Sequence, residues 1–408
     1  MAKILVSGAS IAGPTLAFWL CKSGHTVTVV ERAPAVRTGG YAIDIRGAAL
    51  EVVERMDLLP TLRARATDTL SNAFVDERGR PVATFDRGFG VIDPGDVEIL
   101  RGELASLLYE RTRPHTRYLF DDSITALTED AHGVDVTFLH HPSERFDLVL
   151  GADGLHSQVR ALRFGPEAPL LRHLGGAIAI FTAPNHLGLE RAQWMLMAPG
   201  RVASIKSDHG NRTVKVTLIF TCAERDWDRD DLGQRRLATA AFAGLQGDFM
   251  RPILDAMQTA DDFYADLSSQ VRMPAWHLGR MALVGDAAFA PSAMTGQGTS
   301  LALIGAYLLA DALRDTDGHA DAIALAFGRY QAGLRRFVER NQDVAQDAAK
   351  SFAPRSSLGA WLRNFNLRLL PYMPWRRAII NMMMRDIARA AADLSLDGEP
   401  RATAATTT

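Results

Sequence analysis

The sequence predicts an α/β fold made of a Rossmann-like domain, an inserted antiparallel β-sheet domain and C-terminal helices. Three observations lead to this prediction. A strand, a glycine-rich turn, a helix and a second strand open the chain, an order typical of parallel, doubly wound sheets. Apolar and polar residues alternate in the middle third, which is typical of an antiparallel sheet with one covered face. A buried strand and a second glycine-rich turn then return near residue 280, so we expect the chain to re-enter its first domain.

The N-terminal elements can be read in order. The apolar strand Lys3–Ser7 leads into the first turn, and Val27–Glu31 is the second apolar strand. Pro14–Ser23 lies between them as a helix, with proline near its first position, where the missing N–H is harmless. Phe74–Phe85 and Ile124–Leu139 are each expected to form a hairpin, because turn residues divide two strand-like runs.

The character of the chain changes near Pro169, and Arg212–Cys222 shows the clearest period of two. Arginines interrupt the apolar stretch Leu358–Met384. This pattern is compatible with a membrane-surface helix but favours a helix that packs on the protein and keeps its charges in solvent. We expect a first domain in two parts (1–169 and 280–345), a β-rich substrate domain (170–279), C-terminal helices (346–400) and a disordered tail (401–408).

Composition excludes several classes of protein. The 408 residues carry a formal net charge of −2, which argues against a nucleic-acid partner. Cys21 and Cys222 form no metal-binding or redox spacing, so a cytoplasmic protein with reduced thiols is expected. The eleven histidines show no zinc pattern, so no metal site is predicted. No run reaches the roughly 18 apolar residues of a membrane span. No signal peptide is expected, because the first strand begins close to Met1.

The first glycine-rich turn has the features of a dinucleotide site. Gly8-Ala9-Ser10-Ile11-Ala12-Gly13 joins a strand to a helix, where small residues let a pyrophosphate approach the backbone. Glu31 ends the second strand, where an acid can bind ribose hydroxyls and disfavours a 2′-phosphate. The turn therefore indicates FAD or NAD, with a purely structural turn as the alternative.

Two later segments favour FAD over NAD. The strand at Leu148–Gly151 enters Ala152-Asp153-Gly154, and the strand before Gly285 enters Asp286. An acid after a buried strand can hold the polyol linker of a flavin. The turn Thr295–Ser300 precedes a helix from Leu301, whose positive end can stabilise an anionic reduced flavin.

These motifs, in this order, resemble the aromatic-hydroxylase family of single-component FAD-dependent monooxygenases, which are para-hydroxybenzoate hydroxylase-like proteins. The resemblance extends from Gly8 to about Leu313 and is strongest to the branch of tetracycline-degrading and polyketide hydroxylases. It implies that the Rossmann-like domain binds FAD. The residues that it implies in FAD binding are Gly8, Ser10, Ala12, Gly13, Glu31, Arg32, Asp44, Arg101, Asp153, Asp286, Gly296, Gln297 and Gly298.

The resemblance also implies a nicotinamide contact at Asp153, with Arg37 and Arg160 as further candidates. From the residues alone, Asp153 could instead cap a turn. Arg46 and Arg101 could be solvated charges at helix ends, as most arginines are.

The sequence departs from the family pattern around the second turn. Phe289 stands where many relatives have His, and Ser292-Ala293 stands where they have Pro-Pro. Ser300 replaces a usual Asn, and Gly305 a frequent Asp. These departures bear on the contacts to the flavin ring.

A substrate pocket is expected between the two domains, by analogy with ligand sites at domain interfaces. Packing in an ordinary core is the alternative for the same apolar residues. The candidates to line the pocket are Phe181, Trp194, Met195, Phe220 and Met294.

The resemblance implies an enzyme in which NAD(P)H reduces FAD and O2 adds to the flavin. A flavin C4a-hydroperoxide then hydroxylates an aromatic or polycyclic small molecule, polyketide- or tetracycline-like. The cofactor carries this chemistry, so no catalytic side chain is predicted. Alternatives on the same fold are a flavin halogenase, whose Trp-x-Trp-x-Ile-Pro motif is absent, a flavin-dependent reductase and a non-catalytic flavin-binding module. A monomer and a homodimer are both compatible with the sequence.

Overall fold

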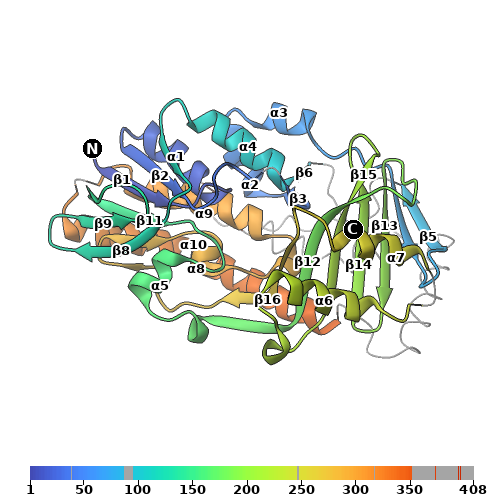
Figure 1. The fold of residues 1–408 in the computed structure, drawn as a ribbon. Helices are drawn as coiled ribbons and strands as arrows, with labels where there is room; N and C mark the ends of the chain where they lie inside the picture. Colours follow the sequence, from blue (N-terminus) through green and yellow to red (C-terminus); the bar gives the residue numbers. More distant parts are fainter. Residues whose placement is uncertain are drawn as a thin grey trace.

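The structure, a computed structural model, describes residues 1–37, 39–86, 95–245, 248–316 and 318–351, with positions 373, 394 and 396. Of the expected C-terminal helices (346–400), the part beyond residue 351 lies outside the described residues except for these three positions. The expected tail (401–408) lies wholly outside the described residues. Two large sheets lie at opposite ends of the molecule, with a two-stranded sheet between them (Figure 1). This arrangement confirms the predicted α/β fold with parallel and antiparallel sheets.

A mainly parallel sheet forms the centre of the first domain. Its central strands are buried on both faces, as the continuous apolar run at residues 4–6 predicts. The order of the described strands is β17-β18-β11-β1-β2-β7, and only β17 runs antiparallel to its neighbour. The strands are β1 (Lys3–Ser7), β2 (Thr26–Glu31), β7 (Arg117–Phe120), β11 (Leu148–Gly151), β17 (His277–Leu278) and β18 (Met281–Leu283).

Helices cover this sheet and pack on one another. The apolar helix α9 contacts α1, α2 and α10 and is buried along most of its length. None of the helices in the described ranges is long and apolar enough to cross a membrane. The helices are α1 (Ala12–Lys22), α2 (Ala48–Arg55), α3 (Leu59–Ala64), α4 (Arg101–Thr112), α5 (Gln158–Phe164), α8 (Asp286–Phe289), α9 (Gly298–Leu313) and α10 (Ala320–Ser351).

The second large sheet has the order β16-β12-β15-β14-β13-β4-β5 among the described strands. Neighbours are antiparallel except β13 and β4. The predicted alternation at Arg212–Cys222 corresponds to β15, which is central and has one fully buried face. The strands are β4 (Ser71–Val75), β5 (Pro81–Asp86), β12 (Leu171–Pro184), β13 (Ala192–Ala198), β14 (Arg201–Ser207), β15 (Thr213–Thr221) and β16 (Tyr264–Val271).

The hairpin predicted over Phe74–Phe85 is present, but it belongs to the second sheet. β4 pairs with β13 in parallel, with Ser71 opposite Ala192. Residues 71–86 therefore leave the first domain, although the sequence predicts 1–169 as one continuous part of it. The pattern of a hairpin shows that one face is covered, but it does not show which sheet supplies the neighbouring strand.

The two faces of the second sheet have different neighbours. One face is covered by α6 (Asp231–Phe242) and α7 (Arg251–Met257), which build a separate apolar core with it. The other, which we call the inward face, meets the first domain. There Ser268 of β16 lies 2.8 Å from the Ser292 hydroxyl, and Gln270 donates to the Pro291 carbonyl (3.1 Å).

Two smaller sheets complete the described fold. β3 (Ala42–Ile45) and β6 (Val97–Leu100) form the antiparallel pair between the large sheets. β8 (Ile124–Glu129) and β9 (Val134–Phe138) form the second predicted hairpin, and β10 (Glu144–Phe146) pairs with β9. Short 3-10 helices occur at Ala168–Leu170, Glu224–Asp226, Asp248–Met250 and Ala293–Thr295.

Candidate functional site

The first glycine-rich turn is closed tightly against neighbouring backbone. Gly8 has a φ of 105°, and a Cβ there would lie 2.5 Å from the carbonyl oxygen of Ala152. At Gly13 a Cβ would lie 1.8 Å from the carbonyl oxygen of Gly8. Both positions therefore require glycine. The turn brings backbone N–H groups to the start of α1, where such groups hold pyrophosphates.

Glu31, at the end of β2, is tied to this turn. Its carboxylate accepts hydrogen bonds from the backbone N–H groups of Ala9 (2.8 Å) and Ala33 (2.9 Å). Arg32 beside it is exposed. The acid thus lies at the carboxyl edge of the parallel sheet, which is where dinucleotide folds hold a ribose.

Asp153 fastens the end of β1 to the start of α5. Its carboxylate accepts four hydrogen bonds from described groups: the Ser7 and Ser157 hydroxyls and the Gln158 and Val159 N–H groups. Burial raises the pKa of Asp153, and these hydrogen bonds oppose the rise. The structural role of this acid is therefore evident in the fold, whether or not it also touches a ligand.

Arg101 and Asp286 lie between the two glycine-rich turns. Arg101 donates to the Ser10 hydroxyl (2.7 Å), and its backbone N–H donates to the Tyr41 carbonyl (3.0 Å). Asp286 opens α8 and is exposed, yet the protein atoms around it hinder hydration and raise its pKa, while Arg101 opposes the rise. A cation and an acid at this place suit phosphate oxygens and hydroxyl groups of a linker.

The turn before α9 holds buried polar atoms that lack partners. Gln297 is 2% exposed, and neither its amide oxygen nor its amide nitrogen has a hydrogen-bond partner among the described residues. A Cβ at Gly296 would lie 3.8 Å from Oδ2 of Asp44. That oxygen accepts from Arg46 (2.7 Å), whereas Oδ1 of Asp44 is buried and has no partner within the described ranges. Buried polar atoms are normally paired, so these point to a ligand.

The residues present fit FAD. The turn at Gly8–Gly13 would hold the pyrophosphate and Glu31 a ribose. Arg101 and Asp286 would hold the linker. Asp44 and Gln297 would lie near the ring, where the N-terminal end of α9 favours negative charge. The structure thus brings together the residues that the motifs predict from distant parts of the chain.

Three rows of side chains cross the inward face of the second sheet, as the strand register dictates. Rows that face a ligand site decide which parts of a ligand are polar and which are apolar. The first row is polar, the second mixed and the third apolar. They are Thr182, Lys215, Lys206, Gln193 and Asn72; then Ile180, Thr217, Ser204, Met195 and Phe74; then Ile178, Ile219, Val202 and Met197.

The register corrects most of the predicted pocket. Phe181, Trp194 and Phe220 point to the opposite face, where they pack in or against the core under α6 and α7. Met195 lies on the inward face, and the side chain of Met294 lies outside the described residues. Aromatic composition is the same for a core and a pocket, so only the strand pairing could separate these residues.

Arg160 is also corrected. It is fully buried, and its guanidinium donates to the carbonyls of Ala287 (2.9 Å) and Leu155 (2.5 Å) and to the carboxylate of Glu167 (2.7 Å). These bonds hold the loop after β11 in place and bury the guanidinium, so Arg160 has a structural role that the sequence does not predict. Arg37, the other candidate, is exposed.

Two departures from the family pattern compensate for each other. The Phe289 ring lies 4.8 Å from that of Trp276, centroid to centroid. A Cβ at Gly305 would lie 2.9 Å from the tip of the Phe289 ring. A larger residue at 305 would therefore collide with the phenylalanine, so Phe289 requires a glycine at this position.

A contact without a sequence signal joins the loop after β11 to the second sheet. Nε2 of His156 lies 3.0 Å from a carboxylate oxygen of Asp266, and Nδ1 lies 2.9 Å from Glu167. The hydrogen bond to Asp266, with further help from Glu167, raises the pKa of His156 to about 9 against the effect of burial. Tyr264 also donates to Asp266 (2.9 Å). Asp266 lies 110 residues from His156, so no local pattern could reveal the contact.

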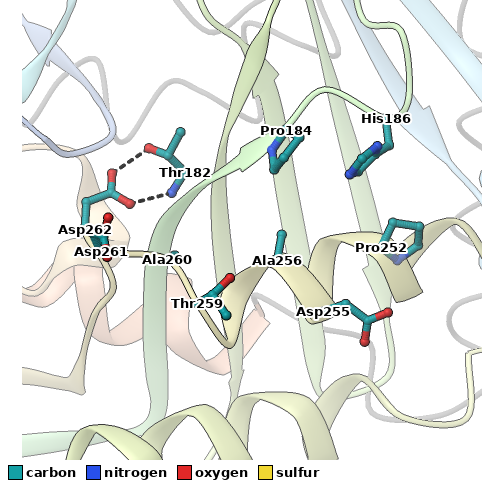
Figure 2. A pocket seen from close by; sticks show the side chains of 10 residues that line it. All are labelled: Thr182, Pro184, His186, Pro252, Asp255, Ala256, Thr259, Ala260, Asp261 and Asp262. Atoms are coloured by element: carbon teal, nitrogen blue, oxygen red, sulfur yellow. Dashed lines mark hydrogen bonds between the residues drawn. The ribbon is translucent and has the colours of Figure 1, made fainter.

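A hollow of about 640 Å³ lies elsewhere, between the end of β12 and α7 (Figure 2). Its lining includes Thr182, His186 and Asp262, and Asp262 accepts from both the backbone N–H (2.9 Å) and the hydroxyl (2.5 Å) of Thr182. None of its lining residues comes from the nucleotide motifs. It is therefore distinct from the cofactor site.

Known proteins are similar to this chain over most of its length. Residues 1–343 match the FAD binding domain family. An uncharacterised protein of Mycobacterium tuberculosis is 42% identical over 364 residues, which cover 87% of this chain and 95% of that protein. A flavin-dependent monooxygenase of an unknown prokaryotic organism is 38% identical over 360 residues, covering 88% and 92%. The crystal structure of tetracycline destructase Tet(55) has a TM-score of 0.83 and 34% identity, covering 97% and 98%.

The chain therefore belongs to the FAD binding domain family, and its cofactor is FAD. Within that family it belongs with the flavin-dependent monooxygenases, which are enzymes. The family resemblance and the enzyme class predicted from the motifs are both confirmed.

Proposed function

We propose that this enzyme uses NAD(P)H and O2 to hydroxylate an aromatic or polycyclic small molecule, polyketide- or tetracycline-like. The observation that carries the proposal is the inward face of the second sheet. Its rows change from polar to apolar across the sheet. Lys206 of the polar row contacts Glu98. Glu98 in turn lies opposite Asp44, which is next to the turn at Gly296. A flat molecule with one polar edge suits such a face. Similarity to a structure described as a tetracycline destructase supports a fused-ring substrate.

FAD, when bound, supplies the redox chemistry and the oxygen transfer. The protein's part is to bind, orient and exclude water. We propose that the residues predicted from the motifs perform the binding, from Gly8 at the pyrophosphate to Gln297 at the ring. We propose that the FAD domain consists of residues 1–70, 87–169 and 280–345. The substrate domain then combines residues 71–86 with residues 170–279.

The nicotinamide is proposed to visit the site transiently, because residues 170–279 contain no second glycine fingerprint. Arg37 remains the candidate contact, since its side chain is exposed. A cytoplasmic location is proposed as well: NAD(P)H is present there, and Cys21 and Cys222 are free thiols, as in most proteins of reducing compartments.

The decisive experiment is a turnover assay with isotopic oxygen. Purified protein, reconstituted with FAD, is expected to be yellow and to consume NAD(P)H and O2 when given fused-ring phenols. The product is expected to carry one oxygen atom from ¹⁸O2, seen by mass spectrometry. A product that gains halogen, or NAD(P)H oxidation that yields a reduced product without oxygen incorporation, would contradict hydroxylation.

A matched pair of variants tests where the substrate lies. Met195→Ala alters the inward face and is expected to raise the substrate KM about tenfold or more with little change in unfolding temperature. Met257→Ala alters the opposite core, where Met257 is fully buried, and is expected to cost about 2–5 kcal/mol of stability without changing KM. The reverse pattern would place the substrate elsewhere.

A further inference from the structure

Four ionisable side chains gather at the small β3–β6 sheet: Asp44 and Glu98 within its strands, Arg46 just after β3 and Asp96 just before β6. Asp44 in β3 lies directly opposite Glu98 in β6. Arg46 contacts both Asp44 (2.7 Å) and Asp96 (3.4 Å). None of these four side chains is more than 18% exposed. Their charges therefore interact strongly, because little water reaches them.

Asp44 and Glu98 form a like-charged pair, which repels when two residues lie directly opposite in a sheet. Arg46 compensates Asp44. Lys206 compensates Glu98: its Nζ forms an ion pair with that carboxylate and donates to the Thr67 hydroxyl (3.4 Å). Lys206 is 7% exposed, so removing its charge would leave a buried carboxylate uncompensated.

Lys206 belongs to the second sheet, where it also meets a like charge. The register places Lys206 of β14 opposite Lys215 of β15. Lys215 is compensated by Asp262 (3.6 Å) and donates to the Thr182 hydroxyl (2.6 Å). Each sheet thus contains a repelling pair, and the ion pair between Lys206 and Glu98 relieves both across the domain boundary.

The charged cluster ends at the flavin turn. Oδ2 of Asp44 lies near Gly296, and the backbone N–H of Arg46 donates to the Ser300 hydroxyl (3.3 Å) at the start of α9. Burial raises the pKa of Asp44, while Arg46 and then Lys206 oppose the rise. One of the two cations that oppose the rise in the pKa of Asp44 therefore belongs to the second sheet.

We propose that Lys206 is a positioning residue: its bridge to Glu98 keeps Asp44 charged and fixed beside the turn at Gly296–Gly298. The inference rests on the proposed function in one respect, namely that FAD binds next to Asp44. It gives the substrate sheet a direct influence on the electrostatics of the cofactor site. Within the described part of the chain, the charged groups around Asp44 are Arg46 just after β3, Asp96 just before β6, Glu98 on β6 and Lys206 on β14.

The test compares the pH dependence of NAD(P)H-driven flavin reduction among single and double variants of the full-length holoenzyme. The low-pH side of this profile, the acid limb, is expected to report the protonation of Asp44. Lys206→Met leaves the Asp44 and Glu98 carboxylates facing each other, so the acid limb is expected to move to higher pH by about one unit. Glu98→Gln leaves the lysine alone with Asp44, so the limb is expected to move down. The double variant, which lacks both charges, is expected to fall between the two, close to wild type.

Lys206→Arg keeps the charge and is expected to restore the wild-type limb. Lys3→Met serves as the matched control, because Lys3 pairs with Glu144 far from this site and is 44% exposed. It is expected to leave the limb unchanged. An acid limb that stays in place in Lys206→Met would overturn the proposal and leave Lys206 with a role in folding alone.

A readout without the cofactor separates this inference from the proposed function. In the apoprotein labelled with ¹³C-aspartate, the carboxyl signal of Asp44, assigned through Asp44→Asn, is expected to titrate in the same order of variants. If Lys206→Met does not fold, Glu98→Gln and the double variant still test the proposal. Asp44 is expected to titrate at a lower pH in Glu98→Gln than in the double variant. Identical titrations of Asp44 in these two variants would overturn the proposal. Failure of the wild type to oxidise NAD(P)H would contradict only the proposed function.

Discussion

The two ends of the cofactor site are built in different ways. At the end that we propose for the pyrophosphate, the protein satisfies its own polar groups: Glu31 accepts two backbone N–H groups and Asp153 accepts four hydrogen bonds from described residues. At the end that we propose for the flavin ring, Gln297 and one oxygen of Asp44 are buried without partners among the described residues. At the first end, folding of the chain alone provides the hydrogen-bond partners of these carboxylates. The second end is completed by what binds there, because unpaired buried polar atoms are costly.

The largest effect is expected from Gly13→Ala, which breaks the closed end. The new Cβ would lie 1.8 Å from the Gly8 carbonyl oxygen, so the turn would have to move. We expect a loss of about 3 kcal/mol or more in unfolding free energy and loss of bound FAD, measured by urea unfolding and flavin absorbance. Gly328→Ala in α10 is the control, since its Cβ meets nothing within 4 Å, and it should be neutral or stabilising by up to about 1 kcal/mol.

Asp153→Asn weakens the same end less severely. The amide can keep its oxygen on the Gln158 and Val159 N–H groups, but its N–H donors then face the Ser157 hydroxyl, which already accepts from the Arg160 N–H. We expect a loss of about 2 kcal/mol in urea unfolding. Asp130→Asn, in the exposed turn between β8 and β9, should have a smaller effect. Equal losses in the two variants would show that the closed end has no special rigidity.

The link from the closed end to the second sheet is expected to depend on pH. The pKa of His156 is raised to about 9, so the folded state holds its proton more tightly than the unfolded state. Its stabilising contribution is fully present below the unfolded value near pH 6.5 and is lost as pH rises through about 9. The difference in unfolding temperature between wild type and His156→Gln should therefore shrink across this window. A constant difference would contradict the charged pair with Asp266.

The smallest effect on stability is expected from Gln297→Leu at the open end. The amide has no partner to lose among the described residues, so apoprotein stability should change by less than about 1 kcal/mol, in either direction. FAD affinity, measured by the quenching of flavin fluorescence, should fall several-fold. An apoprotein destabilised as strongly as Asp153→Asn would remove the distinction between the two ends.

The same distinction explains how far the sequence could predict this molecule. The closed end is made by segments that carry their own pattern, such as the turn at Gly8–Gly13 between two apolar strands, and that pattern predicts them. The pairing of Lys206 with Glu98 has no pattern, because the partners lie 108 residues apart and each resembles an ordinary surface charge. Phe181 and Phe220 show the same limit: alternation indicates two faces but does not identify which face meets the first domain.

The pairing of β4 with β13 limits how the segment 170–279 can be exchanged between related genes. A recombination event that exchanged only residues 170–279 would bring in a new β13 without its partner, because the edge of that sheet is finished by residues 71–86. The exchanged strand would then meet a foreign hairpin or stand as an open edge prone to association. The inward face, which we propose to face the substrate, is thus encoded in two separated stretches of the gene.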